Sequence, residues 1–191
     1  MRRRGAAALA AFTLLAGACG GGSDGDDNDN VGPPDDGMTG GCVADSNMDV
    51  YSAPGIVHTD APGYAGPLGA GPAPTYTVNP PSGGDHLAQA ARPGVYAGLN
   101  IVPDGNLVHA LEHGYVILWY RSDVPVAEVT TVRAVRDTYP RDTLVVERKD
   151  MPVPIAATAW QQRLLCQRAD ADDLGDFVEK ARSKAPEKVP H

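Results

Sequence analysis

Residues 115–120 read YVILWY, a continuous apolar run of β-branched and aromatic side chains. A run of this length without polar alternation is typical of a strand that is buried on both faces of a sheet. In the next segment, 126–139, apolar side chains recur at three- and four-residue spacing, which predicts an amphipathic helix. We expect Ser122 or Asp123 to cap this helix and Pro125 to occupy its first turn.

Two further strands and a second helix follow along the chain. Residues 143–147 (TLVVE) and 155–160 (IAATAW) are short apolar runs that predict strands. Residues 174–181 place apolar side chains on one helical face, with aspartates before them and basic residues after them, which suits the helix dipole. The order strand, helix, strand, strand, helix predicts an α+β domain with a small mixed sheet covered by helices. This order resembles the second half of a thioredoxin fold, although no Cys-x-x-Cys pair supports redox chemistry.

The first residues have the order of an export signal. Three arginines precede an apolar run, and the small residues Ala16, Gly17 and Ala18 precede Cys19. This order resembles the lipobox of bacterial lipoproteins, in which the cysteine becomes the lipidated first residue of the mature chain. We therefore expect a signal peptide over 1–18, lipid attachment at Cys19, and an extracytoplasmic, membrane-anchored position in the cell envelope. The alternative is an ordinary cleaved signal with a cysteine nearby.

The segment after this cysteine is rich in glycine and aspartate and has few apolar side chains. Because it cannot bury enough apolar surface to offset the entropy of ordering, we expect residues 19–37 to form a disordered tether. Residues 38–75 remain Gly- and Pro-rich and predict irregular chain, and the globular domain is expected over 76–187. The formal net charge of −8 argues against a nucleic-acid partner, because phosphate contacts need a basic surface. The sequence indicates no particular protein partner.

Two cysteines remain once Cys19 carries a lipid, and in an oxidising compartment they can pair. We predict a Cys42–Cys166 disulfide that ties the loose chain around Cys42 to the core. The loop that it closes is long, so the chain-entropy model assigns it roughly 4–5 kcal/mol. The alternative is a pair of free thiols, with Cys166 simply buried.

Residues 108–114 read VHALEHG and hold the closest pair of histidines in the sequence. On a helix, His109 and His113 lie one turn apart, with Glu112 on the adjoining face. Gly114 would then end the helix in a left-handed conformation. The two imidazoles could share a metal ion in this arrangement. In an extended chain they would lie about 13 Å apart, which is too far for a shared ion.

A loop upstream can supply a third ligand. Residues 79–86 read NPPSGGDH, whose prolines and glycines predict a stiff, sharply turned loop that ends at His86. Imidazole is a ligand for both zinc and copper, so three converging histidines would form a transition-metal site. Met151 precedes the predicted strand 155–160 and could add a thioether that favours copper, and its alternative role is core packing.

The combination of these motifs resembles the domain-of-unknown-function family 3105, found mostly in bacterial exported and membrane-anchored proteins. The family pattern has an Asn-Pro-Pro turn that ends in histidine, then Val-His-x-Leu-Glu-His-Gly, an Ala-Trp pair, and a Phe-containing helix that ends in Pro-Glu. These elements appear at 79–86, 108–114, 159–160 and 177–187. The resemblance supports the domain boundaries and singles out the three histidines and Glu112, and it implies no reaction.

Three functional hypotheses follow from these residues. The first is a non-enzymatic domain that binds Zn or Cu through His86, His109 and His113, with Glu112 as a ligand or as the hydrogen-bond partner of a histidine. The second is a metal-dependent hydrolase in which Glu112 activates a metal-bound water, since His-x-x-Glu-His also matches the inverted zinc-peptidase motif. The third is an envelope interaction module whose histidines are structural. The sequence leaves enzymatic activity open, and we take the metal-binding hypothesis forward.

Overall fold

A computed structural model describes residues 41–45 and 74–187 of the 191-residue chain. The predicted signal peptide, the lipidation site Cys19, the tether and most of the segment 38–75 lie outside the described residues. None of the helices in the two described ranges is long and apolar enough to cross a membrane.

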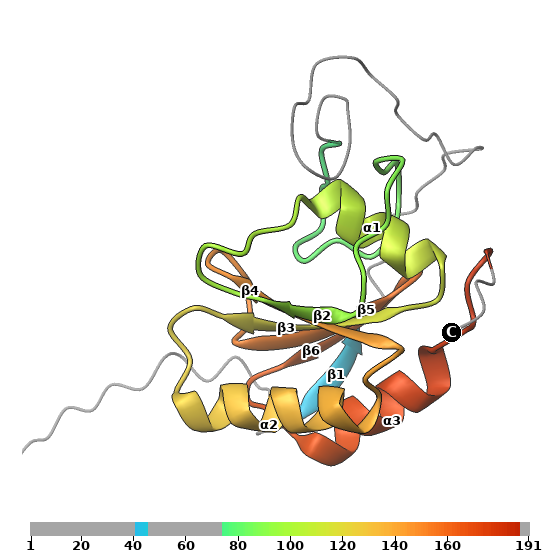
Figure 1. Ribbon diagram of the computed structural model, residues 1–191. Helices are drawn as coiled ribbons and strands as arrows, with labels where there is room; N and C mark the ends of the chain where they lie inside the picture. Colours follow the sequence, from blue (N-terminus) through green and yellow to red (C-terminus); the bar gives the residue numbers. More distant parts are fainter. Residues whose placement is uncertain (1–40, 46–73, 188–191) are drawn as a thin grey trace, which may run out of the picture. The chain divides into compact units, whose positions relative to one another are not determined.

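Six strands and three helices make up the described part of the chain (Figure 1). In chain order they are β1 (Cys42–Asp45), β2 (Gly94–Tyr96), α1 (Asp104–Glu112), β3 (Val116–Arg121), α2 (Val126–Thr138), β4 (Thr143–Arg148), β5 (Ile155–Ala159), β6 (Gln162–Cys166) and α3 (Ala171–Ala181). The strands form one sheet in the order β1-β6-β5-β3-β4-β2. β2 and β3 run parallel to β4, whereas the β3–β5, β5–β6 and β6–β1 pairs are antiparallel. The predicted α+β fold with a mixed, helix-covered sheet is thus confirmed.

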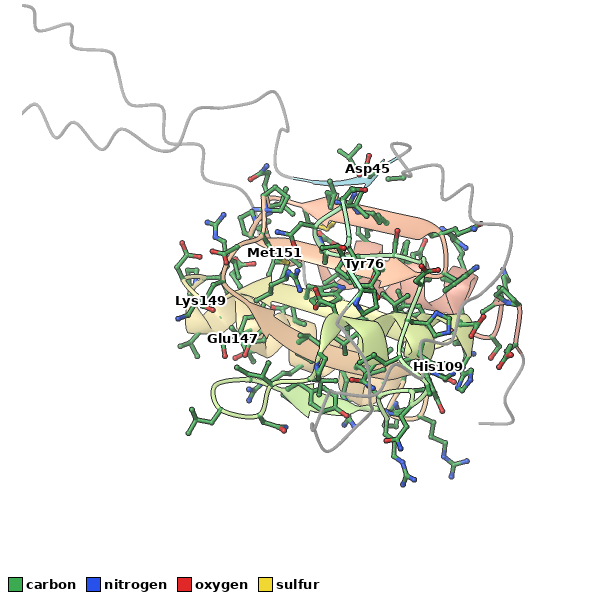
Figure 2. The ribbon with its side chains drawn as sticks, turned by 90° about the horizontal axis from the view of Figure 1, so that it is seen from above. Asp45, Tyr76, His109, Glu147, Lys149 and Met151 are labelled. Atoms are coloured by element: carbon green, nitrogen blue, oxygen red, sulfur yellow. A yellow bond between two sulfur atoms is a disulfide. The ribbon has the colours of Figure 1, made fainter. Side chains whose placement is uncertain are left out.

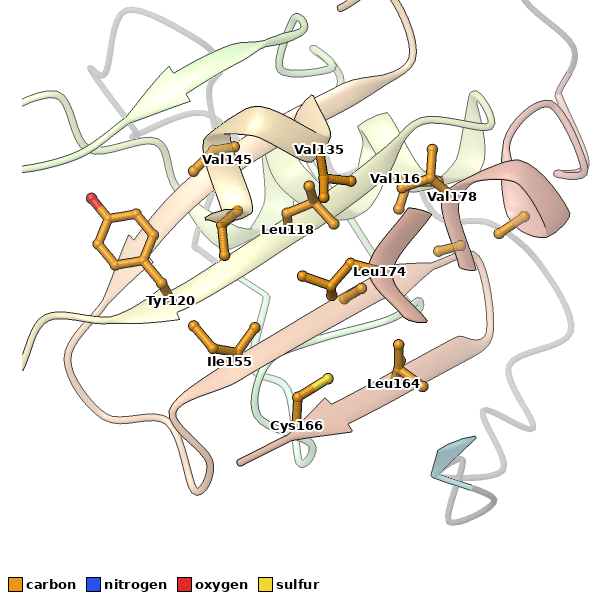
Figure 3. Packing of buried hydrophobic residues seen from close by; sticks show 14 residues of the cluster. Val116, Leu118, Tyr120, Val135, Val145, Ile155, Leu164, Cys166, Leu174 and Val178 are labelled. Carbon is orange, nitrogen blue, oxygen red and sulfur yellow. The ribbon is translucent and has the colours of Figure 1, made fainter. Parts of the chain in front are cut away.

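Helix α1 covers one face of the sheet, and α2 and α3 cover the other (Figure 1). Successive side chains of a strand point to opposite faces, so β3 contributes to two hydrophobic clusters. Leu118 packs in a cluster with Val135 of α2 and Leu174 of α3 (Figure 3). Ile117 and Trp119 belong to the second cluster, which includes residues of α1. The central strand is therefore buried on both faces, as its apolar run predicts.

The helix predicted over 126–139 is α2, but neither Ser122 nor Asp123 caps it. Pro125 occupies the N-cap position, and no side chain accepts a hydrogen bond there. Asp123 instead accepts a hydrogen bond from Arg121 Nε at 2.6 Å, and this bond lowers the pKa of the Asp123 carboxyl. The capping prediction is wrong because a proline stands at the N-cap and the nearby carboxylate has an arginine partner at the end of β3.

The strand predicted over 155–160 is β5, which ends at Ala159. A hairpin turn leads from β5 into β6, a strand that the sequence pattern did not predict. Trp160 and Gln161 form the turn between β5 and β6, and Gln161 has a positive φ of 56°. β6 then pairs with β5 on one side and with β1 on the other. This hairpin was missed because its turn contains none of the glycine or asparagine residues that usually mark a two-residue connection.

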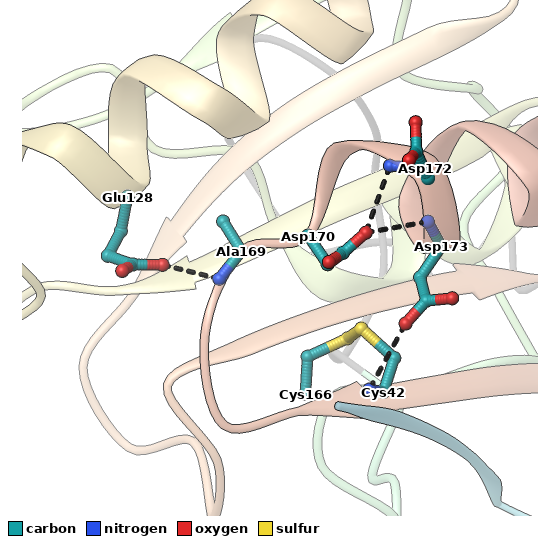
Figure 4. Close-up of a disulfide and its surroundings, with 7 residues drawn as sticks. All are labelled: Cys42, Glu128, Cys166, Ala169, Asp170, Asp172 and Asp173. Carbon is teal, nitrogen blue, oxygen red and sulfur yellow. Dashed lines mark hydrogen bonds between the residues drawn. A yellow bond between two sulfur atoms is a disulfide. The ribbon is translucent and has the colours of Figure 1, made fainter. Parts of the chain in front are cut away.

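Cys42 and Cys166 form the predicted disulfide. The two residues face each other in the β1–β6 register, so the bond ties β1 to the edge of the sheet (Figure 4). At the same place, the Cys42 amide donates to Asp173 Oδ2 at 3.3 Å, and Asp170 caps α3. Residues 42–45 thus form a strand inside the segment expected to be irregular, because β6 offers them an edge and the disulfide holds them there.

Candidate metal centre

The metal hypothesis requires a helical conformation around His109 and His113, and helix α1 meets this condition. It ends at Glu112, with His113 as its C-cap residue and Gly114 directly after it at φ +90°. His109 and His113 therefore lie one turn apart on the helix, with their ring centroids 4.5 Å apart. The predicted left-handed glycine end is confirmed, and it turns the chain from α1 into β3.

The Asn-Pro-Pro turn is anchored against the start of α1. Arg148, the last residue of β4, donates from Nε to Asn79 Oδ1 at 2.6 Å. Its two terminal nitrogens donate to the Asp104 carboxylate at 2.7 and 2.9 Å. Such a bidentate arginine–carboxylate pair has a well-defined geometry. The turn is thus held to both β4 and α1, and the chain that follows it brings His86 beside the helix.

His86, His109 and Glu112 form a buried group, which we call the inner group. Glu112 Oε2 lies 3.0 Å from His86 Nε2, and both side chains are completely buried. The ring centroids of His86 and His109 are 4.7 Å apart. One ligand atom from each of the three residues lies within 4.8 Å of the other two, which is close enough to hold a metal ion.

The backbone assigns the proton positions on the two inner histidines. His86 Nδ1 lies 2.9 Å from Gly84 O, and His109 Nδ1 lies 2.6 Å from Leu87 O. A carbonyl oxygen can only accept, so each Nδ1 carries a proton and donates it. In a neutral ring, Nε2 is then the nitrogen with the lone pair that can bind a metal. Metal-binding histidines characteristically have this arrangement, since the second hydrogen bond orients the ring and fixes its tautomer.

A second group, which we call the outer group, reaches the surface and shares His109. His109 Nε2 lies 3.0 Å from His113 Nε2, which in turn lies 3.2 Å from Glu187 Oε2. The side chains of His113 and Glu187 are 20% and 48% exposed. The ligand atoms of these three residues also lie within 4.8 Å of one another. Within the described ranges, the inner and outer groups are the two His/Cys/Asp/Glu groups with this spacing.

Three of the ligand-atom separations are close to the spacing of ligands around one small cation. With its proton on Nδ1, a neutral His86 presents the Nε2 lone pair to a Glu112 carboxylate oxygen, and this contact is favourable when a proton or a metal ion lies between them. Two ligands on tetrahedral zinc, at bond lengths of about 2.0–2.2 Å, are themselves about 3.3 Å apart. The observed separations of 3.0 and 3.2 Å are close to this value. These three contacts are therefore compatible with a small metal ion.

The structure divides the predicted set of three histidines between the two groups. His86 belongs to the inner group, His113 belongs to the outer group, and His109 belongs to both. Glu112 lies in the inner group with its carboxylate at His86. Glu187 was not among the predicted site residues, because it is distant from the histidines in the sequence. Its one signal was the Pro-Glu end of the family pattern.

Met151 lies elsewhere in the domain. It is buried in the hydrophobic cluster on the α1 face of the sheet, together with Leu107 and Trp119. Figure 2 shows Met151 well away from His109. The position of Met151 agrees with the alternative role in core packing. The ligand atoms of the inner and outer groups are thus nitrogen and oxygen.

Comparison with known proteins identifies a family for this chain. A family model described as "Protein of unknown function (DUF3105)" matches residues 71–191. No curated protein and no solved structure matches the chain. The matched region contains the 79–86 turn, the 108–114 helix motif and Glu187, and it covers more than half of the sequence. The chain therefore belongs to the DUF3105 family of proteins of unknown function.

Proposed function

We propose that this protein is an exported, lipid-anchored metal-binding protein whose globular domain holds one transition-metal ion at the inner group. The observation that carries the proposal is the convergence of two Nδ1-protonated imidazoles and a completely buried carboxylate, from His86, His109 and Glu112. A buried carboxylate is strongly disfavoured without a compensating positive charge. A divalent cation supplies that charge and also binds the two imidazole lone pairs.

Zinc is the metal that this donor set favours. Two imidazoles and one glutamate are the protein ligands of known types of zinc site. Copper(I) prefers soft sulfur ligands, and Met151, the thioether considered from the sequence, packs in the hydrophobic core. We therefore expect the inner group to select zinc over copper(I).

The proposed location rests on the sequence and on one structural feature. The signal-like residues 1–18 and the cysteine that follows them support export and lipid attachment at Cys19. The Cys42–Cys166 disulfide supports an oxidising, extracytoplasmic compartment, because disulfides are rare where cellular thiols keep proteins reduced.

The burial of Glu112 argues against its role as the general base of a hydrolase. A metal-dependent hydrolase needs an open coordination position that a substrate can reach, and a general base beside it. The Glu112 side chain is completely buried against His86 in this structure. Glu112 is therefore proposed as a metal ligand and not as a general base.

Elemental analysis of the purified full-length chain tests this proposal. The wild-type chain should contain a stoichiometric amount of zinc that a chelator removes, whereas the double variant His109→Ala with His113→Ala should contain none. His58→Ala changes a histidine outside the described residues and is the matched control, which should retain zinc. Circular dichroism verifies that each variant is folded. If the wild type carries no more metal than the double variant, the histidines are structural and the envelope-module hypothesis replaces this one.

A further inference from the structure

After α3 the chain turns back across the end of α1, in a segment over 182–187 that we call the C-terminal strap. In Figure 1 the chain leaves α3 and rises past the sheet toward the level of α1. The Ser183 amide donates to Gly114 O at 2.9 Å, and the Glu187 amide donates to Glu112 O at 3.2 Å. The strap is therefore bonded to the carbonyl group of the last residue of α1 and to that of Gly114 just beyond the helix, beside the histidines.

The strap can approach this closely because Gly114 has no side chain. A Cβ atom at this position would lie 2.9 Å from Ser183 Cα and 3.2 Å from Ser183 N. Both are backbone atoms that cannot rotate away, so a larger residue would push the strap off the helix end. The glycine thus ends α1 and also allows the strap to bring Glu187 to His113.

The solvent exposure of the side chains decreases from the outer group at the strap to the inner group. Glu187 is half exposed, His113 is one-fifth exposed and His109 is nearly buried, whereas His86 and Glu112 are completely buried. An ion that arrives from solvent therefore meets the outer group first. A surface carboxylate also attracts a hydrated cation before any direct bond forms.

His109 cannot bind a metal in both groups at once. Its Nδ1 donates to Leu87 O, which leaves Nε2 as its one metal-binding atom. The two groups are therefore alternative positions for a single ion. The rings of His86 and His113 flank His109 at centroid distances of 4.7 and 4.5 Å. An ion bound to His109 can thus exchange the outer ligands for the inner ones by a short shift.

We propose that the outer group is a capture site from which a divalent metal ion such as zinc passes to the inner group, with Glu187 as the capture ligand. This inference rests on the proposed function and adds the route by which the inner group is filled. Glu187 does not bind the ion in its final position. Its removal should therefore slow loading and release alike and leave the equilibrium dissociation constant nearly unchanged.

Stopped-flow measurement of zinc loading into the metal-free, full-length chain in detergent micelles tests this route, with free zinc followed by a fluorescent indicator. Glu187→Gln keeps the size of the side chain and removes its charge. This variant should load zinc about 10-fold more slowly than the wild type, or slower still, because it loses the charge that attracts the cation. Its dissociation constant should match that of the wild type. Asp176→Asn is the matched control, because Asp176 is an exposed carboxylate on α3 that pairs with Lys180 of the same helix and lies outside both groups and the strap.

Three other results would each overturn a different statement. Equal loading rates for the wild type, Glu187→Gln and Asp176→Asn would remove the capture role and leave the inner-group proposal intact. A loss of equilibrium affinity in Glu187→Gln as large as that in Glu112→Gln would place Glu187 in the resting site and not on a route to it. If the wild type takes up no zinc, the proposed function itself fails, and the capture route fails with it.

Discussion

Replacing Gly105 with alanine tests how the inner group is held in place. Gly105 lies in the first turn of α1, and a Cβ atom there would lie 2.7 Å from Leu87 Cγ and 3.1 Å from Pro74 Cδ. Cβ atoms do not approach other atoms to 2.7 Å, so either Leu87 or the helix has to move. The Leu87 amide donates to Gly105 O at 3.2 Å, and Leu87 O accepts the hydrogen bond from His109 Nδ1. A shift of Leu87 against Gly105 is therefore expected to pass through the Leu87 backbone to a proposed metal ligand.

The matched substitution is Gly175→Ala in α3, where a Cβ atom would meet nothing within 4 Å. Both substitutions gain the helix propensity of alanine, about 1 kcal/mol. Gly105→Ala alone adds an overpacking cost of about 1–3 kcal/mol. The free energies of unfolding of the two variants should therefore differ by about 1–3 kcal/mol, with Gly175→Ala more stable than the wild type. For a domain of about 100 residues, each kcal/mol shifts the melting temperature by roughly 4–8 °C.

Thermal unfolding followed by circular dichroism, in the presence of a chelator, measures this difference without a contribution from bound metal. Zinc calorimetry on the same variants then reports on the orientation of His109. Gly105→Ala should lose about 10-fold or more in affinity, whereas Gly175→Ala should lose none. If the two variants melt at the same temperature and bind zinc equally, the start of α1 does not pack on Leu87 as described. Packing at Gly105 would then not fix the Leu87 carbonyl or, through it, the orientation of His109.

The remaining predictions concern the carboxylate, the disulfide and the anchor. Glu112→Gln should weaken zinc binding by about 10–100-fold, and calorimetry that shows wild-type affinity would exclude Glu112 from the inner group. Cys42→Ser should destabilise the domain by about 5 kcal/mol, the chain-entropy estimate for residues 124 apart in sequence. Two free thiols, counted on the unfolded and unreduced wild type, would refute this bond between Cys42 and Cys166. Cys19→Ala should release the protein from the membrane fraction of cells, and continued membrane association would show that another segment is the anchor.

Apolar patterning alone determined the main elements of the fold. The run over 115–120 predicted a strand buried on both faces, and this strand is β3 at the centre of the sheet. Helices α2 and α3 could be predicted from three- and four-residue spacing, because periodicity is a local property of the chain. Strands β1 and β2 could not be predicted, because they are four and three residues long and only partly buried. Their pairing partners, β6 and β4, lie far away in sequence.

The candidate site likewise has features that the sequence predicts and features that only the tertiary structure decides. Helical spacing places His109 beside His113, and the turn-forming residues before His86 marked it as a third candidate. The tertiary structure alone decided that His86 faces Glu112 and that Glu187 reaches His113. These contacts depend on how the Asn-Pro-Pro turn packs on α1 and how the chain after α3 crosses the end of that helix. Such packing joins segments far apart in sequence, and a local pattern of side chains does not encode it.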